Sequence, residues 1–340
     1  MEVNQFDNQP NKAETETPPQ QLTGRPFEFA GAPTVNGKSN QAAHLTTPSA
    51  LLNETVAEPA QFKPDATSSA SKLYLSLVIP AYNEAVRLPD TLAQVLKWLE
   101  SQPYQSEILV VDDGSSDDTA SIVKRLIADS QVISTQAKNK GGEADSGGRC
   151  RLQLIENPHR GKGFAVRTGM LQGQGDFILF SDADLCTPIS EANKLLFWLD
   201  QGFDVSIGSR EGVGARRYGE PAYRHLMGRV FNLIVRIVTN SPFQDTQCGF
   251  KAFTRQAAHD LFHRVQLYAD DSPPVQGAMV TGFDVEVLFL ALKRNYRVKE
   301  VPVEWYHVKG SKVSPVKDSL RMLRDIASVR LNDIKGVYRR

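Results

Sequence analysis

Short apolar runs alternate with helical patterns along the chain from Leu73 onward. Each run is short enough to form one buried strand. The segments between runs repeat apolar residues three and four positions apart, which is typical of helices. This alternation predicts an α/β fold, with a mostly parallel sheet covered by helices on both faces. The expected strands are 75–79, 107–111, 152–156, 177–181 and 205–208, and the expected helices are 88–99, 119–127, 163–171 and 190–199.

Composition divides the chain into three parts. Residues 1–71 are rich in Gln, Asn, Thr, Ser, Pro and Ala without a sustained apolar period, so we expect a disordered polar tail. Residues 72–308 form the predicted α/β domain, in which the polar, glycine-rich stretch 134–148 is expected to be a loop. Residues 309–340 are basic and are predicted to form an amphipathic helical segment. Its apolar stripe is Val316, Leu320, Leu323, Ala327, Leu331 and Ile334.

Charge and cysteine content narrow the class of protein. Lys plus Arg total 39 and Asp plus Glu total 39, so the net charge indicates no particular partner. No basic run is interleaved with aromatic residues, which argues against nucleic-acid binding. Cys150, Cys186 and Cys248 are unclustered, which fits a reducing compartment and gives no metal-site spacing. We expect no signal peptide, because the N-terminus lacks an apolar core segment, and no bilayer-spanning helix, because no apolar stretch approaches roughly 20 residues.

Two carboxylates follow the expected strand 177–181 directly. Asp182 and Asp184 are two residues apart, so on an extended backbone their side chains point the same way and can reach one ion. Hard oxygen ligands suit Mg²⁺ or Mn²⁺ that carries a diphosphate. A solvated turn after a strand is the alternative interpretation.

The ends of the first two strands carry groups suited to a nucleoside. Pro80 ends the first ladder, and Tyr82 supplies a flat face for a base. Asp113 follows the second strand, where its carboxylate can accept the imide N–H of uracil. Gly114 permits a tight turn there. We interpret most of the polar residues 115–118 as caps of the next helix.

Basic residues follow the third and fifth strands. Lys162 lies between two glycines before a helix, which indicates either a phosphate contact or a simple loop. The nearby His159 is interpreted as a surface histidine. After the fifth strand, arginines could clamp a phosphate through paired donors. Arg210 and Arg224 are the favoured candidates, whereas Arg216, Arg217 and Arg229 fit an ordinary basic surface.

These motifs together resemble family 2 glycosyltransferases of the GT-A fold. The resemblance is carried by 78–84, by 110–115 and by Asp182-Ala183-Asp184. Downstream motifs narrow it to the dolichyl-phosphate β-glucosyltransferases and their bacterial polyprenyl-phosphate relatives. Those motifs are 161–163, 245–251, 283–286 and 310–313, and the resemblance covers about 75–324.

The resemblance implies a GT-A, Rossmann-like fold and a role for each matching residue. Asp182 and Asp184 would bind the metal, and both would be catalytic together with Asp284 and Arg210. Asp284 occupies the position of the base in many members of the family; a carboxylate at a helix N-terminus is the alternative. The nucleotide sugar would contact Pro80, Ala81, Tyr82, Glu84, Asp112, Asp113, Lys162, Asp182 and Ala183, and the acceptor phosphate Arg210, Arg224 and Lys312.

Three further residues modify this picture. Cys186 stands where the mannosyl branch usually has glutamine, and a thiol is a poor partner for Mg²⁺, which argues against that branch. We interpret Cys248 as a small core residue, because no histidine accompanies it. Lys251 could add positive charge near the acceptor, but we interpret it as an ordinary surface lysine.

The expected reaction is metal-assisted, inverting transfer of glucose from UDP-glucose to a polyprenyl phosphate. A phosphate acceptor is already anionic at pH 7. It needs no strong base, so Asp284 would orient groups rather than remove a proton. The rivals are transfer of another sugar, such as mannose from GDP-mannose, and a non-catalytic sugar-nucleotide-binding protein. A nucleotidyltransferase is disfavoured, because no glycine-rich phosphate loop follows the first strand.

A polyprenyl acceptor implies contact with a membrane surface. Residues 227–238 suit a helix that lies in the interface, and the basic 309–340 segment would be attracted to anionic headgroups. The alternative for the second segment is packing on the domain or on a second subunit, which leaves a homo-oligomer possible. The expected location is cytoplasmic, peripheral to the cytoplasmic face of a membrane, with anchoring direct or through a membrane partner.

Overall fold

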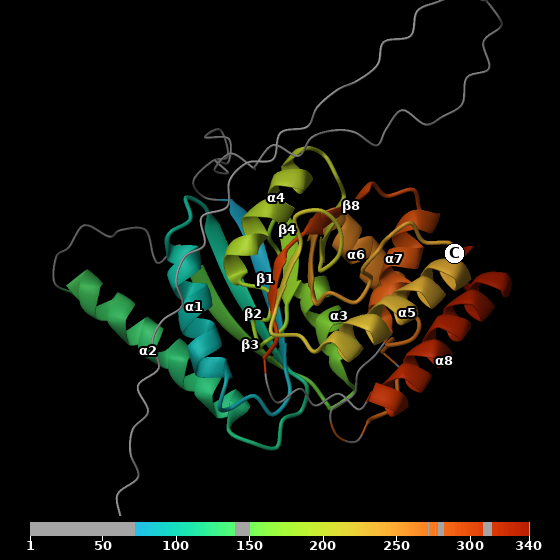
Figure 1. The fold of residues 1–340 in the computed structure, drawn as a ribbon. Coiled ribbons are helices and arrows are strands. Elements are labelled where there is room, and N and C mark those ends of the chain that lie inside the picture. The colour runs from blue at the N-terminus through green and yellow to red at the C-terminus, as the bar shows by residue number, and fades with distance from the viewer. Residues whose placement is uncertain are drawn as a thin grey trace, which may run out of the picture. The chain divides into compact units, whose positions relative to one another are not determined.

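Seven strands form one mostly parallel sheet in the computed structural model (Figure 1), which describes residues 72–139, 150–270, 272–275, 277, 282–308 and 315–339. The strand order is β3-β2-β1-β4-β7-β5-β8. Strand β7 runs antiparallel to both of its neighbours, β4 and β5, and the other pairings are parallel. The strands are β1 (Leu73–Ala81), β2 (Gln105–Asp112), β3 (Cys150–Glu156), β4 (Phe177–Ser181), β5 (Val205–Ser209), β7 (Phe250–Thr254) and β8 (Val298–Pro302).

Helices cover both faces of this sheet, as predicted. Alternate residues of one strand point to opposite faces. Thus Val78 packs in the core beneath α3, α6 and α7, whereas Leu77 and Ile79 pack beneath α1, α2 and α4. These helices are α1 (Leu88–Glu100), α2 (Thr119–Asn139), α3 (Lys162–Gln172), α4 (Ala192–Asp200), α6 (Arg255–Arg264) and α7 (Phe283–Lys293), with a short 3₁₀ turn, η1 (Ile189–Glu191), before α4.

The five strands and four helices expected from the apolar pattern are all present, so the α/β fold class is confirmed. One expectation is wrong. The stretch 134–148 was predicted to be a loop, but α2 continues to Asn139. Residues 134–139 contain neither Gly nor Pro, so nothing in them ends the helix. Residues 140–149 lie outside the described part of the chain, as do the predicted tail 1–71 and the segment 309–314.

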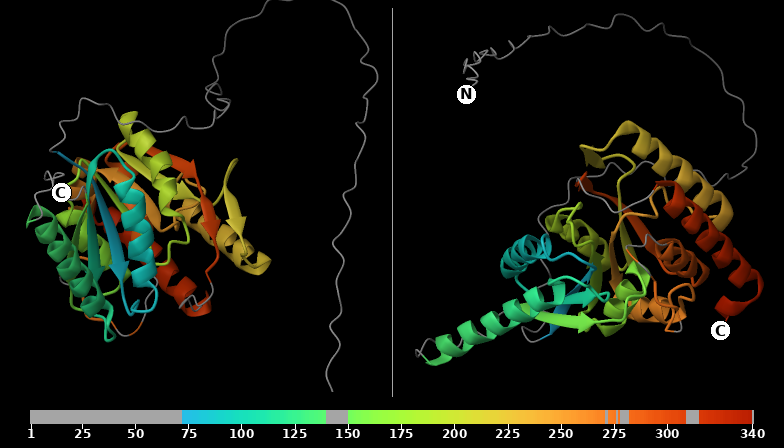
Figure 2. Two further views of the ribbon diagram at one scale, coloured as in Figure 1. Left: turned by 90° about the vertical axis from the view of Figure 1, so that its left-hand side faces the viewer. Right: turned by 90° about the horizontal axis from the view of Figure 1, so that it is seen from below.

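The carboxy-terminal elements lie together on one side of the sheet. Helix α5 (Ala222–Thr239) lies beside α8 (Pro315–Ile334), as Figure 1 and Figure 2 both show. They share a small core with α7 built on Val235, Val285 and Ile326. The remaining elements are a two-stranded parallel sheet of β6 (Arg216–Tyr218) and β9 (Glu304–Tyr306), and the 3₁₀ turn η2 (Val337–Arg339).

The buried face of α8 differs from the predicted stripe. Met322, Ile326 and Val329 are buried, whereas Leu320, Leu331 and Ile334 are 65%, 50% and 76% exposed. Packing therefore selects a face rotated from the one that the sequence pattern favoured. Within the described residues, no helix is both long enough and apolar enough to traverse a bilayer.

Candidate active site

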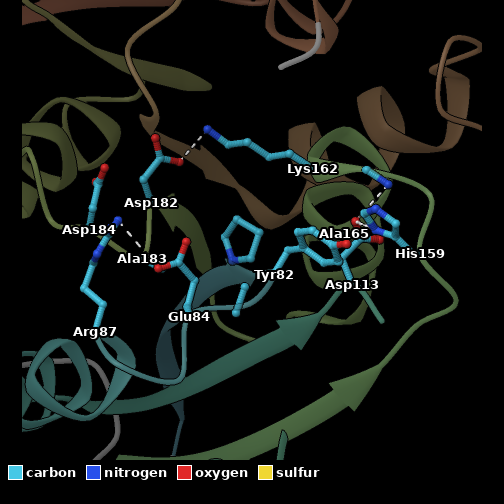
Figure 3. Close-up of a pocket in the computed structure, with 13 residues that line it drawn as sticks. Tyr82, Glu84, Arg87, Asp113, His159, Lys162, Ala165, Asp182, Ala183 and Asp184 are labelled. Atoms are coloured by element: carbon cyan, nitrogen blue, oxygen red, sulfur yellow. Dashed lines mark hydrogen bonds and ion pairs between the residues drawn. The ribbon is translucent and has the colours of Figure 1, made fainter. Parts of the chain in front are cut away.

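A pocket of about 180 Å³ opens at the carboxyl ends of β1, β2 and β4 (Figure 3). Parallel sheets of this class bind ligands at that edge. The described pocket has an aromatic end and an acidic end, with Lys162 extending between them. Its lining consists of Pro80, Ala81, Tyr82, Glu84, Arg87, Asp113, His159, Gly161, Lys162, Ala165, Asp182, Ala183 and Asp184.

Asp182 and Asp184 form the acidic end of the pocket. The Lys162 ammonium lies 2.6 Å from Asp182 Oδ1, and Asp184 Oδ1 accepts a hydrogen bond from the Cys186 amide at 3.1 Å. Burial and the neighbouring Asp184 raise the pKa of Asp182, although Lys162 opposes that rise. Burial alone would lower the pKa of Lys162, but its attraction to Asp182 raises the pKa above its usual value. The lysine and the carboxylate therefore stabilise each other's charge.

The position of Asp182 depends on Gly249, which immediately precedes strand β7. The Asp182 amide donates to the Gly249 carbonyl at 3.2 Å. A Cβ at position 249 would lie 2.2 Å from Asp182 Oδ2, so only glycine leaves room for the carboxylate. The antiparallel β7, which begins at Phe250 beside β4, brings this glycine to the site. Sequence reasoning included Gly249 in a motif without recognising this role.

Cys186 follows the acidic pair but is poorly suited to hold a cation. Burial and the nearby Asp184 raise the pKa of the Cys186 thiol to about 12. A thiol binds metals as the thiolate, so this group stays a poor ligand at neutral pH. Among the described residues, no group of three or more His, Cys, Asp or Glu side chains gathers around one point.

Tyr82, His159 and Asp113 form the aromatic end of the pocket (Figure 3). The Tyr82 and His159 rings are stacked, with centroids 3.9 Å apart and planes 2° from parallel. His159 Nδ1 lies 2.8 Å from Asp113 Oδ2. The interpretation of His159 as a surface histidine is therefore wrong, because its ring is held inside the pocket by two specific contacts.

The Asp113 carboxylate also organises the loop between β3 and α3. Its oxygens accept the amide N–H groups of Arg160 at 2.9 Å and Gly161 at 2.8 Å. Burial raises the pKa of Asp113, and these hydrogen bonds work against the rise. Asp112, by contrast, does not line the pocket: it is buried, and its Oδ2 accepts the Ser115 amide at 3.2 Å. The structure thus places Asp112 under the turn that presents Asp113.

The polar residues after β2 bind the loop after β1 as well as starting α2. Ser115 Oγ accepts the Asn83 amide and Thr119 Oγ1 accepts the Glu84 amide, both at 2.9 Å. Asp117 accepts the amides of Ala85 and Thr119. These bonds fix the segment that carries Tyr82 and Glu84 against the second strand.

Lys251 and Asp284 form a buried ion pair behind the acidic end. Both side chains are nearly inaccessible, at 1% and 6%, and the Lys251 ammonium lies 2.5 Å from Asp284 Oδ1. The same ammonium donates to the Cys248 carbonyl at 2.5 Å. The interpretation of Lys251 as a surface lysine is wrong, because its partner lies 33 positions away at the start of α7. Cys248 is buried, as predicted for a core residue.

Arg210 is held by a carboxylate that sequence reasoning did not single out. Its Nε and Nη2 donate to Asp245 Oδ2 at 2.7 Å and Oδ1 at 2.9 Å. Asp245 is fully buried, and its amide donates to Glu300 on β8 at 2.8 Å. Of the other two residues predicted to contact an acceptor phosphate, Lys312 lies outside the described residues and the Arg224 side chain is not described.

The chain matches the model of the family described as "Glycosyl transferase family 2" over residues 76–262. Curated relatives include a dolichyl-phosphate beta-glucosyltransferase of Drosophila melanogaster, 34% identical over 286 residues. The match covers 78% of this chain and 77% of that relative. The human protein of the same name is 31% identical over 283 residues, and the match again covers 78% of this chain and 77% of that relative.

Solved structures give more distant matches. A mannosyltransferase from Pyrobaculum calidifontis, in complex with GDP-Man and Mn²⁺, is 17% identical with a TM-score of 0.48. That match covers 82% of this chain and 68% of the other.

Proposed function

This chain belongs to glycosyl transferase family 2, and we propose that it transfers glucose from UDP-glucose to a dolichyl-type polyprenyl phosphate. The chain is a glycosyltransferase by its family. The lipid-phosphate acceptor and the glucosyl group are inferred from the relatives, which carry the name dolichyl-phosphate beta-glucosyltransferase.

The observation that carries the proposal is the two-ended pocket. A sugar nucleotide has a flat base at one end and an anionic diphosphate with its sugar at the other. The described pocket offers the Tyr82 ring and the Asp113 carboxylate at one end and Asp182, Asp184 and Lys162 at the other. We therefore place the uracil at the aromatic end and the diphosphate beside Lys162.

The acidic end fits a divalent cation whose remaining ligands come from the substrate. Mg²⁺ commonly binds through one or two carboxylates plus phosphate oxygens rather than through an all-protein cage. Asp182 and Asp184 supply two such carboxylates, and Cys186 adds no suitable ligand. When bound, Mg²⁺ or Mn²⁺ would neutralise charge on the leaving diphosphate. Lys162 pairs with Asp182 in this structure and lies within reach of the same phosphate region.

The acceptor phosphate attacks the anomeric carbon from the face opposite UDP, so the configuration inverts. A phosphate is already anionic at neutral pH. No side chain has to take a proton from it, which suits Asp284, because this carboxylate is committed to the Lys251 ammonium. We assign Asp284 to the support of the acidic end rather than to proton abstraction. The acceptor phosphate would contact Arg210, Arg224 and Lys312. At Arg210 it would accept from Nη1, because Nε and Nη2 donate to Asp245.

A helix face next to Arg210 is suited to the lipid part of the acceptor. Helix α5 exposes a row of large apolar side chains whose spacing follows one side of the helix. Glu211, which follows Arg210, accepts from His225 on α5 at 3.1 Å and pairs with Arg217 at 2.7 Å, which ties this helix to the acceptor region. We propose that this face contacts the membrane surface. The row consists of Tyr223, Leu226, Val230, Leu233 and Ile237, which are 51–73% exposed.

The experiment that tests the proposal is a donor panel with a lipid acceptor. Purified protein with Mn²⁺ is incubated with labelled UDP-glucose, UDP-N-acetylglucosamine or GDP-mannose, together with dolichyl phosphate. We expect label in the organic phase from UDP-glucose alone. Label from GDP-mannose alone would establish the mannosyl rival, against which Cys186 argues. Asp184→Asn serves as the catalytic control and should lose turnover while its far-UV circular dichroism stays unchanged.

A further inference from the structure

We infer that His159 occupies the nucleobase position itself and that UDP must displace its imidazole from Tyr82 to bind. The inference rests on the proposed function, because it takes the aromatic end of the pocket as the uracil site. It assigns His159 as an internal competitor of the donor substrate.

The imidazole reproduces both contacts expected of the uracil ring. It lies flat against Tyr82 at 3.9 Å, where a base would stack. It also places Nδ1 2.8 Å from Asp113 Oδ2. Since an ionised carboxylate can only accept, Nδ1 is the donor in this contact, as the imide nitrogen of uracil would be. One carboxylate and one aromatic face thus serve either ring.

The two rings cannot be accommodated together on that face of Tyr82. A base inserted between Tyr82 and His159 would need a full stacking distance on each of its sides, whereas the present centroids are only 3.9 Å apart. The described pocket, at about 180 Å³, is also smaller than the 300–1,000 Å³ typical of ligand sites. Withdrawal of the imidazole would enlarge the pocket at the end where the base has to enter.

The side chain can leave without disturbing the loop that carries it. Asp113 holds this loop through the backbone amides of Arg160 and Gly161, and those two bonds do not involve the imidazole. The loop lies between β3 and α3, outside any regular element, and the His159 side chain is still 16% accessible. Besides the Asp113 bond, displacement breaks the contact between His159 Nε2 and the Gly277 carbonyl at 3.1 Å.

The test is calorimetric binding of UDP, with Mn²⁺ present, to the full chain and to His159→Ala. Removal of a competing ring stack and hydrogen bond should tighten UDP binding by about tenfold. Binding of inorganic pyrophosphate should not change, because it lacks a base. His263→Ala, at an exposed histidine outside the pocket, is the matched control and should bind UDP like the wild type.

The outcomes separate this inference from the proposed function. Weaker or unchanged UDP binding by His159→Ala would overturn the inference, since His159 would then be a platform for the base or a bystander. An equal gain for pyrophosphate would overturn it too. Failure of both proteins to bind UDP would instead reject the donor assignment, and the inference with it. Should His159→Ala not fold, the imidazole signals of wild-type protein decide: UDP must shift His159 away from the Tyr82 ring current.

Discussion

At the residue scale, the absence of a side chain at Gly249 leaves the space that the Asp182 carboxylate occupies. A Cβ there would lie 2.2 Å from Asp182 Oδ2 and 2.5 Å from its carboxyl carbon, so either the carboxylate or strand β7 has to move. We predict that Gly249→Ala lowers kcat by about a hundredfold, because a displacement of about 1 Å in a group that positions the reactants can have that effect. Steady-state kinetics measure it.

The control for this variant is Gly228→Ala on α5. Nothing lies within 4 Å of a Cβ at that position, and alanine is the better helix former by roughly 0.5–1 kcal/mol. That variant should keep its kcat and unfold at the same or a higher temperature. A Gly249→Ala enzyme with kcat near that of the wild type would show that Asp182 does not depend on this approach.

The Lys251–Asp284 pair allows a stability prediction at the same scale. Removal of one partner leaves an unpaired charge in the interior, which costs about 3–5 kcal/mol, whereas replacement of both with apolar groups costs far less. Lys251→Met should therefore lower the free energy of unfolding by that amount, and Lys251→Met/Asp284→Leu should recover most of it. Urea denaturation measures both.

Lys124→Met provides the comparison for an exposed pair. Lys124 and Glu156 are 2.9 Å apart, with side chains 57% and 54% exposed. The free energy of unfolding of this variant should therefore stay within about 0.5 kcal/mol of the wild-type value. If the double variant at positions 251 and 284 were as unstable as Lys251→Met, the loss would come from packing rather than from the unpaired Asp284.

At the scale of elements, the apolar pattern predicted β1 to β5 but neither the parallel strand β8 nor the antiparallel strand β7. Strand β4 is a continuous apolar run, and its predicted bounds, 177–181, are those of the structure. Strand β7 carries Lys251 as its second residue, and a lysine in a sequence resembles an exposed position. Its neutralising partner, Asp284, comes from another element, and local periodicity contains no information about that pairing.

The candidate site was predictable to a similar extent. Residues that follow buried strands, such as Tyr82, Asp113 and Asp182, were identified because parallel strands end at one edge of the sheet. His159, Gly249 and Asp245 were not, because their roles depend on contacts with distant segments. The only sequence signal for the last two was their place in the motif 245–251.

The connection between α5 and β7 depends on Asp245, and this dependence should vary with pH. Burial alone would raise the pKa of Asp245, but the Arg210 guanidinium lowers the pKa well below its usual range. For a carboxylate with a lowered folded-state pKa, the stabilisation is present above the unfolded pKa of about 3.9 and is lost as the pH falls toward the folded value.

Asp245→Asn should therefore be about 3–5 kcal/mol less stable than the wild type at pH 7. The difference should shrink by about 1.4 kcal/mol for each pH unit below about 3.9. Urea titrations of both proteins at pH 7 and pH 3 measure it. A difference that is the same at both pH values would mean that the lost stability comes from hydrogen-bond geometry rather than from charge.

At the scale of the whole molecule, the proposed function requires a water-soluble donor and a membrane-bound acceptor to meet at one site. The pocket proposed for the donor lies at the carboxyl edge of β1, β2 and β4, while α5 and α8 lie side by side next to α7. Both helices expose large apolar residues, but among the described side chains only those of α5 contact the segment that follows Arg210. Docking through α5 would therefore hold the acceptor phosphate near the arginines proposed to receive it.

The α5 face can be tested against α8 with matched pairs of substitutions. Leu226 and Leu233 on α5 are 65% and 54% exposed, and Leu331 and Ile334 on α8 are 50% and 76% exposed. Each large apolar side chain buried in lipid contributes about 1.5–3 kcal/mol, so Leu226→Gln/Leu233→Gln should weaken binding to anionic vesicles by more than tenfold. Leu331→Gln/Ile334→Gln should leave vesicle binding within about twofold of the wild type, because a helix that does not enter the bilayer loses nothing by becoming more polar.

Turnover of the α5 double variant should depend on whether the acceptor lies in a membrane, because its substitutions lie outside the pocket proposed for the donor. With dolichyl phosphate in vesicles, the α5 pair should be slow. With a short-chain isoprenyl phosphate that dissolves in water, it should match the wild type, since no membrane has to be reached. Vesicle co-sedimentation and the two acceptor assays measure these effects. Equal losses of vesicle binding in the α5 and α8 double variants would assign docking to both helices. Full vesicle binding by the α5 double variant would show that α5 does not contact the membrane.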